Sequence, residues 1–283
     1  MSPAVMAARA GLQRGRIEFR QSATSAQELW GVMFFPMIAM IVLYLLRDRA
    51  VPGTGFSLGT QAIPGVLAMN VVFTGMMGAA IALTLDREDG TLLRAKATPG
   101  GMVGYLTGKV VGRGGMVLLT VLVPLAVAAP LFDGLRLDRA SSWVTLAWVL
   151  ALGLVAVLPL GAITGSLFTG TQAMSVVTLP TMALMAISGL FYPISALPGW
   201  LQGVAQVFPV YWLGLGLRSA LLPDAMAVAE TGESWRHLET AGMLGVWAFA
   251  GLAVAPAVLR RMARRESGSS VAARREKAMR RAM

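Results

Sequence analysis

The sequence predicts an all-α integral membrane protein, and three features of its composition and pattern support that class. Of the 283 residues, 56% are hydrophobic and 13% are charged, whereas soluble domains carry roughly 25% charged residues. The mean hydropathy is +0.67. Long uncharged apolar runs alternate with short charged segments. A soluble core would not absorb this much apolar surface, so we expect the runs to cross a bilayer as helices.

Six apolar segments are long enough to cross a bilayer, which takes roughly 20 predominantly apolar residues. The predicted spans are 29–46, 62–85, 114–132, 143–168, 172–192 and 241–259, which together define a transmembrane domain over 29–259. A further apolar stretch, 207–222, is interrupted by Pro209, Gly214 and Gly216. We expect it to be re-entrant or interfacial, because irregular backbone at membrane depth needs protein or water as a partner. It belongs to a predicted extracellular re-entrant segment over 193–222.

The basic residues are distributed unevenly between the two sides of these spans. With six spans, both termini and the segment between spans two and three share a side, and they hold 18 of the 24 Lys and Arg residues. The other side holds six, namely Arg47, Arg49, Arg136, Arg139, Arg218 and Arg236. The positive-inside rule then places both termini in the cytoplasm and 193–240 outside. The net charge of +10 is therefore a topology signal, and we do not expect nucleic acid as a partner.

The two terminal segments are basic. The cytoplasmic N-terminal segment 1–28 mixes arginines with Leu12, Ile17 and Phe19, a composition that fits an amphipathic helix on the membrane surface; a disordered leader fits equally well. The tail 260–283 is expected to be solvated and held near anionic lipid. The sequence thus predicts a multi-pass protein of the plasma (inner) membrane.

A charged stretch, "DREDGTLLRAKATPGGMVGYLTGK", separates the second and third predicted spans at 86–109. Three carboxylates precede a short helical run over 91–97, and Pro99 ends it. Its first part, "DREDGTLLRAKATP", resembles the "ER-x-x-GT-x-x-x-x-x-ATP" loop of the permease subunits of type-2 ABC exporters. Asp86 stands where Glu is more usual, and Ala95-Lys96 replaces two apolar residues. The matching residues are Asp86, Arg87, Glu88, Gly90, Thr91, Leu92, Arg94, Ala97, Thr98 and Pro99.

A second stretch resembles the same family. "SGLFYPISALPGWLQGVAQVFPVYWLGLGLRSAL" is similar to the family's Ser-Gly-aromatic-aromatic-Pro segment after the fifth span. This resemblance implies an extracellular re-entrant element that contains a short amphipathic helix. Its residues are Pro193, Pro198, Trp200 and Pro209, and Trp200, Tyr211 and Trp212 suit an interfacial depth.

The resemblance implies a role for the charged loop, 86–113. It would carry the coupling helix that sits in a groove of a separate ABC ATPase subunit, which holds the ATP and magnesium. The coupling residues would be Asp86, Arg87, Glu88, Gly90, Thr91, Leu92, Arg94, Thr98 and Pro99. A second permease copy, most simply as a homodimer, would complete the pathway.

The residues themselves agree that the chain is not an enzyme and takes its energy from a partner. "GYLTGKV" departs from the P-loop in its glycine spacing and lacks the hydroxyl residue after Lys109. The six span interiors hold no Asp, Glu, Lys or His for proton coupling. Ser166 and Ser188 lack a neighbouring span with His, and the chain has no Cys and a single His237, which leaves no catalytic or metal site.

Polar and methionine side chains mark an expected substrate pathway on spans two and five. Hydroxyls and adaptable methionines suit a hydrophobic or amphipathic substrate, a drug or antibiotic, although small polar residues also pack helices together. The alternatives are export of lipid or polysaccharide, or a non-transporting membrane component. The expected pathway residues are Asn70, Thr74, Met77, Ser175, Thr178 and Met182.

Overall fold

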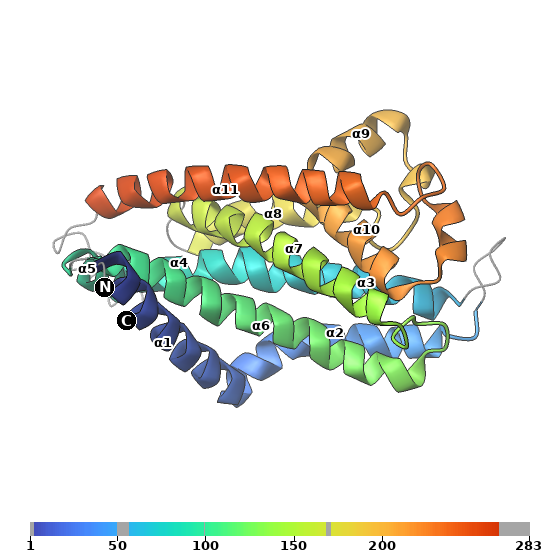
Figure 1. The fold of residues 1–283 in the computed structure, drawn as a ribbon, viewed down its shortest axis with the longest axis horizontal. Coiled ribbons are helices and arrows are strands. Elements are labelled where there is room, and N and C mark those ends of the chain that lie inside the picture. Colours follow the sequence, from blue (N-terminus) through green and yellow to red (C-terminus); the bar gives the residue numbers. More distant parts are fainter. Residues whose placement is uncertain (1–2, 50–56, 99, 168–170, 266–283) are drawn as a thin grey trace.

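The computed structural model describes residues 3–49, 57–98, 100–167 and 171–265, which form an elongated helical bundle (Figure 1). Most of the long helices run close to the long axis of the molecule, and α1 crosses the bundle obliquely (Figure 1). In chain order the helices are α1 (Pro3–Thr24), α2 (Ala26–Leu45), α3 (Leu58–Val72), the π-helix η1 (Phe73–Met77), α4 (Gly78–Glu88), α5 (Thr91–Lys96), α6 (Gly101–Leu131), α7 (Ala140–Leu167), α8 (Thr171–Ile187), the short η2 (Ile194–Ala196), α9 (Gly199–Val207), α10 (Pro209–Leu221), η3 (Asp224–Ala229) and α11 (His237–Arg265).

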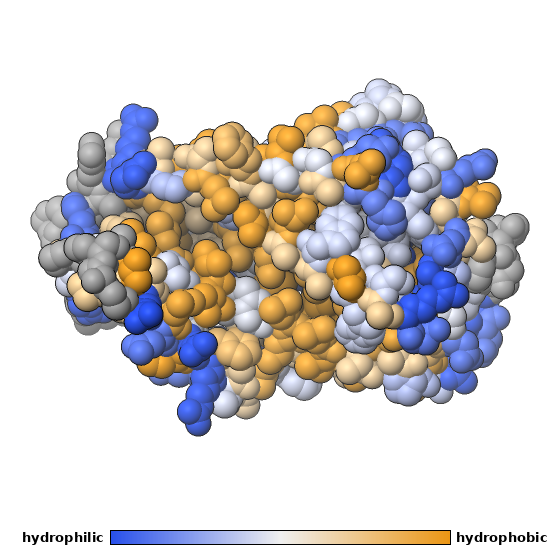
Figure 2. Space-filling model, in the orientation of Figure 1, coloured by the Kyte–Doolittle hydropathy of each residue, from blue (hydrophilic) through white to orange (hydrophobic). Residues whose placement is uncertain are grey.

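The predicted class is confirmed, since an apolar band separates two hydrophilic ends of the molecule (Figure 2). Among the described residues, five helices are long and apolar enough to span a membrane. They are α2, the continuous unit of α3, η1 and α4, then α6, α7 and α11. The fifth predicted span corresponds to α8, whose 17 residues extend about 26 Å at the usual helical rise. This is shorter than the roughly 30 Å apolar layer of a bilayer, so a sixth span stays a prediction.

The helices define two ends of the bundle. The start of α1, the end of α4, all of α5 and the end of α11 lie together at one end, here named the α5 end (Figure 1). The turns after α2, α6 and α10 lie at the opposite end. The chain therefore brings both described ends and the charged stretch to one side, as the charge distribution predicts. Which compartment that side faces stays a prediction.

Helix α6 begins earlier than the sequence suggested. The coupling loop was expected to run to residue 113, and the third span to begin at 114. Instead Gly100 takes a left-handed conformation, with φ at 69°, and α6 continues without interruption from Gly101. Only 97–100 and the turn at 89–90 separate the helices of this region. The first turns of α6, residues 101–113, contain four glycines, Lys109 and Arg113, which interrupt the apolar run. The predicted span therefore began only after them.

Helix α1 is an ordered element, which decides between the two readings of the N-terminal segment. Its Gly11 and Gly15 face the backbone of α6, where a Cβ on Gly11 would stand 2.4 Å from the carbonyl oxygen of Gly104. A Cβ on Gly15 would stand 2.7 Å from the carbonyl oxygen of Gly108. Small residues four apart on both helices allow this approach. The contact corresponds to small-xxx-small patterns in the sequence, at Gly11 and Gly15 on α1 and at Gly104 and Gly108 on α6.

Helix α10 corrects the prediction that the stretch 207–222 is broken, while its re-entrant or interfacial placement stays a prediction. It is one uninterrupted helix, and each of its 13 residues is buried. Gly214 and Gly216 do not break it. Their missing side chains admit neighbours, because a Cβ would stand 2.6 Å from Leu190 Cδ2 or 2.8 Å from Val149 Cγ2, respectively. Tyr211 and Trp212 are likewise enclosed by protein, so they do not face the lipid interface. The core of the bundle is built around this helix, which packs on α3, α7 and α11.

An ion pair fixes α10 to the loop that follows it. Arg218 and Glu230 are both buried and bond through two contacts, with Nε to Oε1 at 2.6 Å and Nη2 to Oε2 at 3.2 Å. Arg218 also donates from Nη1 to the carbonyl of Gly189 at 3.0 Å. Two charges are tolerated here because each satisfies the other and the remaining donor finds a carbonyl. The pair closes the opposite end of the bundle.

The arrangement predicts the result of labelling from either side of the membrane. The native chain has no cysteine, so a single Ser195→Cys reports the opposite end and a single Ala97→Cys reports the α5 end. Both positions are exposed. In intact cells, a membrane-impermeant maleimide should label Ser195→Cys and should reach Ala97→Cys only after lysis. The reverse pattern would contradict the charge-based orientation.

The docking of α1 depends on its glycines. Gly11→Ala should lower the unfolding temperature in detergent and speed trypsin cleavage at Arg9 and Arg14, because overpacking costs about 1–3 kcal/mol. Gly114→Ala in α6 is the control, since a Cβ there meets nothing within 4 Å. Equal effects of the two changes would show that the backbone contact does not hold α1 in place.

Candidate functional site

A tight turn joins α4 to α5. Asp89 and Gly90 form this turn, and the φ of Gly90, 79°, lies in the left-handed region that favours glycine. The backbone N–H of Thr91 donates to Oδ1 of Asp89 at 2.7 Å, which satisfies one of the first donors of α5. The Asp-Gly pair therefore sets the direction in which the short helix leaves the bundle.

Helix α5 has one buried and one exposed face. Leu92 and Ala95 are buried, while Arg94 and Lys96 are exposed at the end of the bundle. Arg94 also donates from Nη2 to the hydroxyl of Thr91 at 3.0 Å. The buried face packs in a cluster formed by the ends of α4, α6 and α11, whose members are Leu83, Leu92, Ala95, Tyr105, Ala255, Leu259 and Met262. The buried face of α5 therefore holds the helix on the bundle, and its charged face points to the outside.

Asp86 does not share the exposed position of Glu88 and Arg94. It is only 8% exposed, and its carboxylate turns toward α6. There Oδ2 accepts a hydrogen bond from the Tyr105 hydroxyl at 2.7 Å and lies 2.8 Å from Nζ of Lys109. A carboxylate with little water nearby needs such donors. Asp86 therefore joins α4 to α6 and is not placed to meet a partner directly.

The network continues to α1. Lys109 also lies 3.3 Å from Oε2 of Glu18, and Arg14 donates to Oε1 of Glu18 at 2.8 Å. Partial burial by itself raises the pKa of Glu18, but the hydrogen bond from Arg14 and the charge of Lys109 outweigh it and hold the pKa below its usual value of 4.5. Because the pKa of Glu18 is lower in the folded state, its ionised carboxylate stabilises the fold at pH values above 4.5. This stabilisation is lost as the pH falls through the lowered pKa and Glu18 becomes protonated. Three helices are thus held by alternating charges.

The other predicted coupling residues occupy varied positions. Glu88 is exposed at the end of α4. Arg87 reaches toward α7, with Nη1 3.5 Å from the carbonyl oxygen of Ser166. The Thr98 hydroxyl donates to the Ala95 carbonyl at 3.1 Å and so ends α5. Pro99 lies outside the described residues. The structure brings Glu88 and Arg94 to the outer surface, Gly90 and Thr91 shape the turn, and Leu92 anchors α5 on the bundle.

Residues missed by the sequence reasoning complete the site. Tyr105 and Lys109 lie one turn apart on α6, and Arg14 and Glu18 are spaced likewise on α1. Their i, i+4 spacing would have indicated a shared face, had 101–113 been predicted as a helix. Without α6 in place, Lys109 was only one more basic residue in a loop.

Two of the expected pathway residues, Thr178 and Met77, are in contact. The hydroxyl of Thr178 on α8 lies 4.0 Å from the sulfur of Met77 in η1. Asn70, Thr74 and Met77 are all buried within this single chain, and Met182 is exposed on the outer face of α8. The side chain of Ser175 lies outside the described residues. The Nδ2 of Asn70 has no hydrogen-bond partner among the described atoms, which leaves one buried donor available.

The π-helix η1 interrupts the second span in the middle of this region. A π turn inserts an extra residue, which rotates the side chains beyond it relative to a regular helix, and such turns occur often at functional sites. Gly161 of α7 packs directly on this segment, since its Cβ would stand within 2.2 Å of the Met76 carbonyl oxygen. No pattern in the sequence predicted this π turn.

The four residues predicted for the re-entrant element start and shape the short helices of the opposite end. Pro193 precedes η2, Pro198 precedes α9, and Pro209 is the first residue of α10. Trp200 is 72% exposed on α9. The prediction of a short helix here is confirmed, and its re-entrant placement in a membrane stays a prediction.

Comparison with known proteins assigns the chain's relatives. Residues 48–255 match the family described as ABC-2 family transporter protein. The chain is also similar to the proteins described as probable doxorubicin resistance ABC transporter permease protein DrrC from two strains of Mycobacterium tuberculosis, CDC 1551 / Oshkosh and ATCC 25618 / H37Rv. Each similarity is 23% identity over 192 residues, which cover 66% of this chain and 68% of the relative.

The network around Asp86 can be tested by removing its charge. Asp86→Asn should lower the unfolding free energy by about 1–3 kcal/mol, because Lys109 and the Tyr105 hydroxyl lose a charged partner in a poorly solvated site. The measurement is the unfolding temperature in detergent. Asp86→Glu keeps the charge and should therefore retain most of the stability of the native chain. Asp89→Asn, three residues away and exposed, is the matched control and should change little because its side-chain oxygen still caps α5. Equal losses at both positions would contradict the assignment.

Proposed function

The chain belongs to the ABC-2 family of transporter proteins and is a multi-pass permease of an ABC exporter; from this premise we propose that it moves a hydrophobic or amphipathic drug or antibiotic out of the cell. The ATP is hydrolysed by a separate ABC ATPase subunit that docks on α5. ATP and magnesium are held by that subunit. The permease lies in the plasma (inner) membrane, with its α5 end in the cytoplasm.

The arrangement of α5 is the observation that carries this proposal. A helix of six residues is too short to be stable by itself, and it is kept helical by its apolar contacts with α4, α6 and α11. Its charged residues face away from the bundle. A partner that binds Glu88, Arg94 and Lys96 would therefore push on three membrane helices at once through one apolar cluster.

The bundle can transmit motion from α5 to the expected pathway residues. Asp86 and Lys109 lock the ends of α4 and α6 together, so these ends move as a unit. Further along the second span, η1 replaces regular helical bonding; it contains Met77 and begins three residues after Asn70. A π turn is a weaker point than regular helix. Motion of the α5 end would thus be taken up next to the expected pathway residues.

Three features support a hydrophobic or amphipathic substrate. The contact between Thr178 and Met77 sets an adaptable thioether beside a hydroxyl. The buried Nδ2 of Asn70 has no described partner, so it can donate to a bound molecule. The relatives from Mycobacterium tuberculosis carry the words "doxorubicin resistance" in their description. A second copy of the chain would complete the pathway on the side of the exposed Met182, since Asn70 and Met77 are buried within one chain.

Replacing Glu88 or Gly90 should separate coupling from substrate binding. In a complex reconstituted with its ATPase subunit, Glu88→Gln should reduce substrate-stimulated ATP hydrolysis and export at least tenfold, because a carboxylate at the docking surface loses its cationic partner. Gly90→Val should do the same, since a β-branched residue is strained at a φ of 79°. Substrate affinity, measured by fluorescence titration of the same complex, should change less than twofold.

Two controls accompany this experiment. Glu233→Gln removes an exposed carboxylate at the opposite end and should leave both readouts unchanged. Thr178→Ala should alter substrate affinity and leave basal ATP hydrolysis intact. The isolated permease should hydrolyse no ATP. A tenfold change in substrate affinity for Glu88→Gln, with ATPase stimulation intact, would overturn the coupling role.

A further inference from the structure

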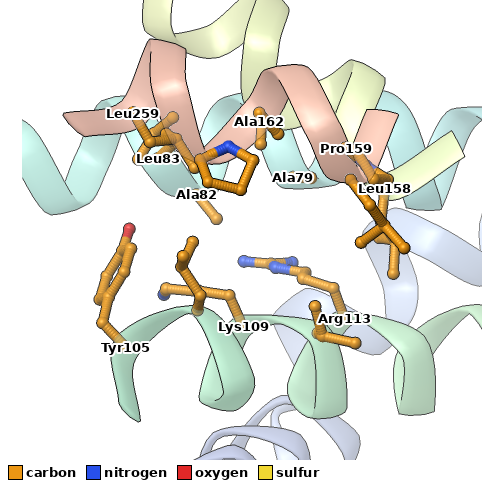
Figure 3. Close-up of a pocket in the computed structure, with 15 residues that line it drawn as sticks. Ala79, Ala82, Leu83, Tyr105, Lys109, Arg113, Leu158, Pro159, Ala162 and Leu259 are labelled. Atoms are coloured by element: carbon orange, nitrogen blue, oxygen red, sulfur yellow. The ribbon is translucent and has the colours of Figure 1, made fainter. Parts of the chain in front are cut away.

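An apolar cavity of about 140 Å³ lies at the α5 end, between α4, α6, α7 and α11 (Figure 3). Its walls are aliphatic, and the side chains that define them include Ala82, Leu83, Leu158, Pro159, Ala162 and Leu259. A cavity of about 150 Å³ with such walls stays dry and admits a small hydrocarbon. This one is therefore suited to part of an alkyl chain and not to water.

Two cations border the cavity, and only one of them is neutralised. Lys109 is paired with Asp86 and Glu18. Arg113, one turn further along α6, extends its guanidinium into the space between the helices (Figure 3). Its Nη1 lies 3.9 Å from the position a Cβ on Gly78 would take. Among the described residues no carboxylate forms an ion pair with Arg113, so a positive charge stands beside an apolar space.

The cavity lies at the depth where a membrane changes from polar to apolar. On α4, α7 and α11 it is lined by the last turns before the predicted spans end at 85, 168 and 259. On α6 it is lined by 105–113, directly before the predicted span begins at 114. A phospholipid changes from phosphate to acyl chain at the same depth. Along α6, Arg113 lies farther from α5 than Tyr105 and Lys109, toward Leu158 and Pro159 (Figure 3). An acyl chain that continues from Arg113 into the membrane would therefore meet these two walls.

We propose that this cavity binds one anionic phospholipid from the leaflet on the α5 side, with its phosphate on Arg113 and an acyl chain against the walls. A guanidinium pairs with phosphate through two parallel hydrogen bonds. A zwitterionic lipid would bring an ammonium group next to the excess positive charge, which disfavours it. A free phosphate would leave the apolar walls uncovered. The site does not depend on what the protein transports.

Occupancy of the site bears on the coupling helix. Leu83, Tyr105 and Leu259 line the cavity and also pack under α5. A bound lipid fills the space between the ends of the same helices and keeps them apart at a fixed distance. The lipid therefore acts as a structural ligand of the end of the bundle that carries α5.

The test compares lipid retention by the full-length protein. The purified chain is incubated with mixed vesicles of phosphatidylglycerol and phosphatidylcholine, extracted in mild detergent and analysed by native mass spectrometry. Arg113→Gln should lower the retention of phosphatidylglycerol at least tenfold and leave phosphatidylcholine unchanged. Arg113→Lys should restore most of the retention. Ala162→Leu, which fills the cavity, should lower retention with the charge intact.

Arg16→Gln is the matched control, because it removes the same charge from an exposed position on α1 outside this cavity. Equal losses for Arg113→Gln and Arg16→Gln would overturn the proposal in favour of unspecific attraction to anionic membranes. Full displacement of the lipid by millimolar inorganic phosphate would overturn it in favour of a simple anion site. Unchanged retention in Ala162→Leu would show that the acyl chain does not enter the cavity.

Discussion

A carboxylate that is largely removed from water must find donors within the protein, and Asp86 finds two of them on α6. The Tyr105 hydroxyl and Lys109 approach it from one helix, and Lys109 in turn binds Glu18 on α1. The position of α5 follows from these bonds, because Asp86 fixes the end of α4 and the short helix begins three residues after α4 ends. Its apolar face then finds Leu83 and Tyr105 already in place beneath it.

The opposite end is closed by the same kind of interaction in a different setting. Arg218 and Glu230 are buried and hold α10 to the loop that follows it. Between the two ends the contacts are almost entirely apolar, and in a membrane they gain little from the hydrophobic effect. Polar bonds at the ends, close backbone contacts at Gly11 and Gly161, and the close contact of Gly216 with the Val149 side chain therefore specify the arrangement. A transporter that moves its helices gains from this distribution, because the middle of the bundle is free of strong directional bonds.

Much of the architecture was accessible from patterns that act locally. The apolar runs predict five of the helices, since a bilayer imposes its thickness on any segment that crosses it. The Asp-Gly pair at 89–90 and Pro198 predict where short helices begin, because backbone geometry depends on neighbouring residues. The family's coupling pattern identified the stretch around α5. Glu88 and Arg94 could be expected on its surface from the sequence alone, whereas the burial of Asp86 could not.

The sequence by itself determined the class, the sites where most helices lie and the segment that carries the charged surface, because those properties follow from hydropathy and local turn chemistry. Only the tertiary structure decided that α6 begins at Gly101, that Gly214 and Gly216 are contact points inside an intact α10, and that η1 interrupts the second span. It also decided that Lys109 serves Asp86 and Glu18 while Arg113 faces an apolar cavity. Two cations four residues apart on one helix look alike in a sequence. Their difference arises from which carboxylates other helices bring within reach, and that depends on packing between segments far apart in the chain.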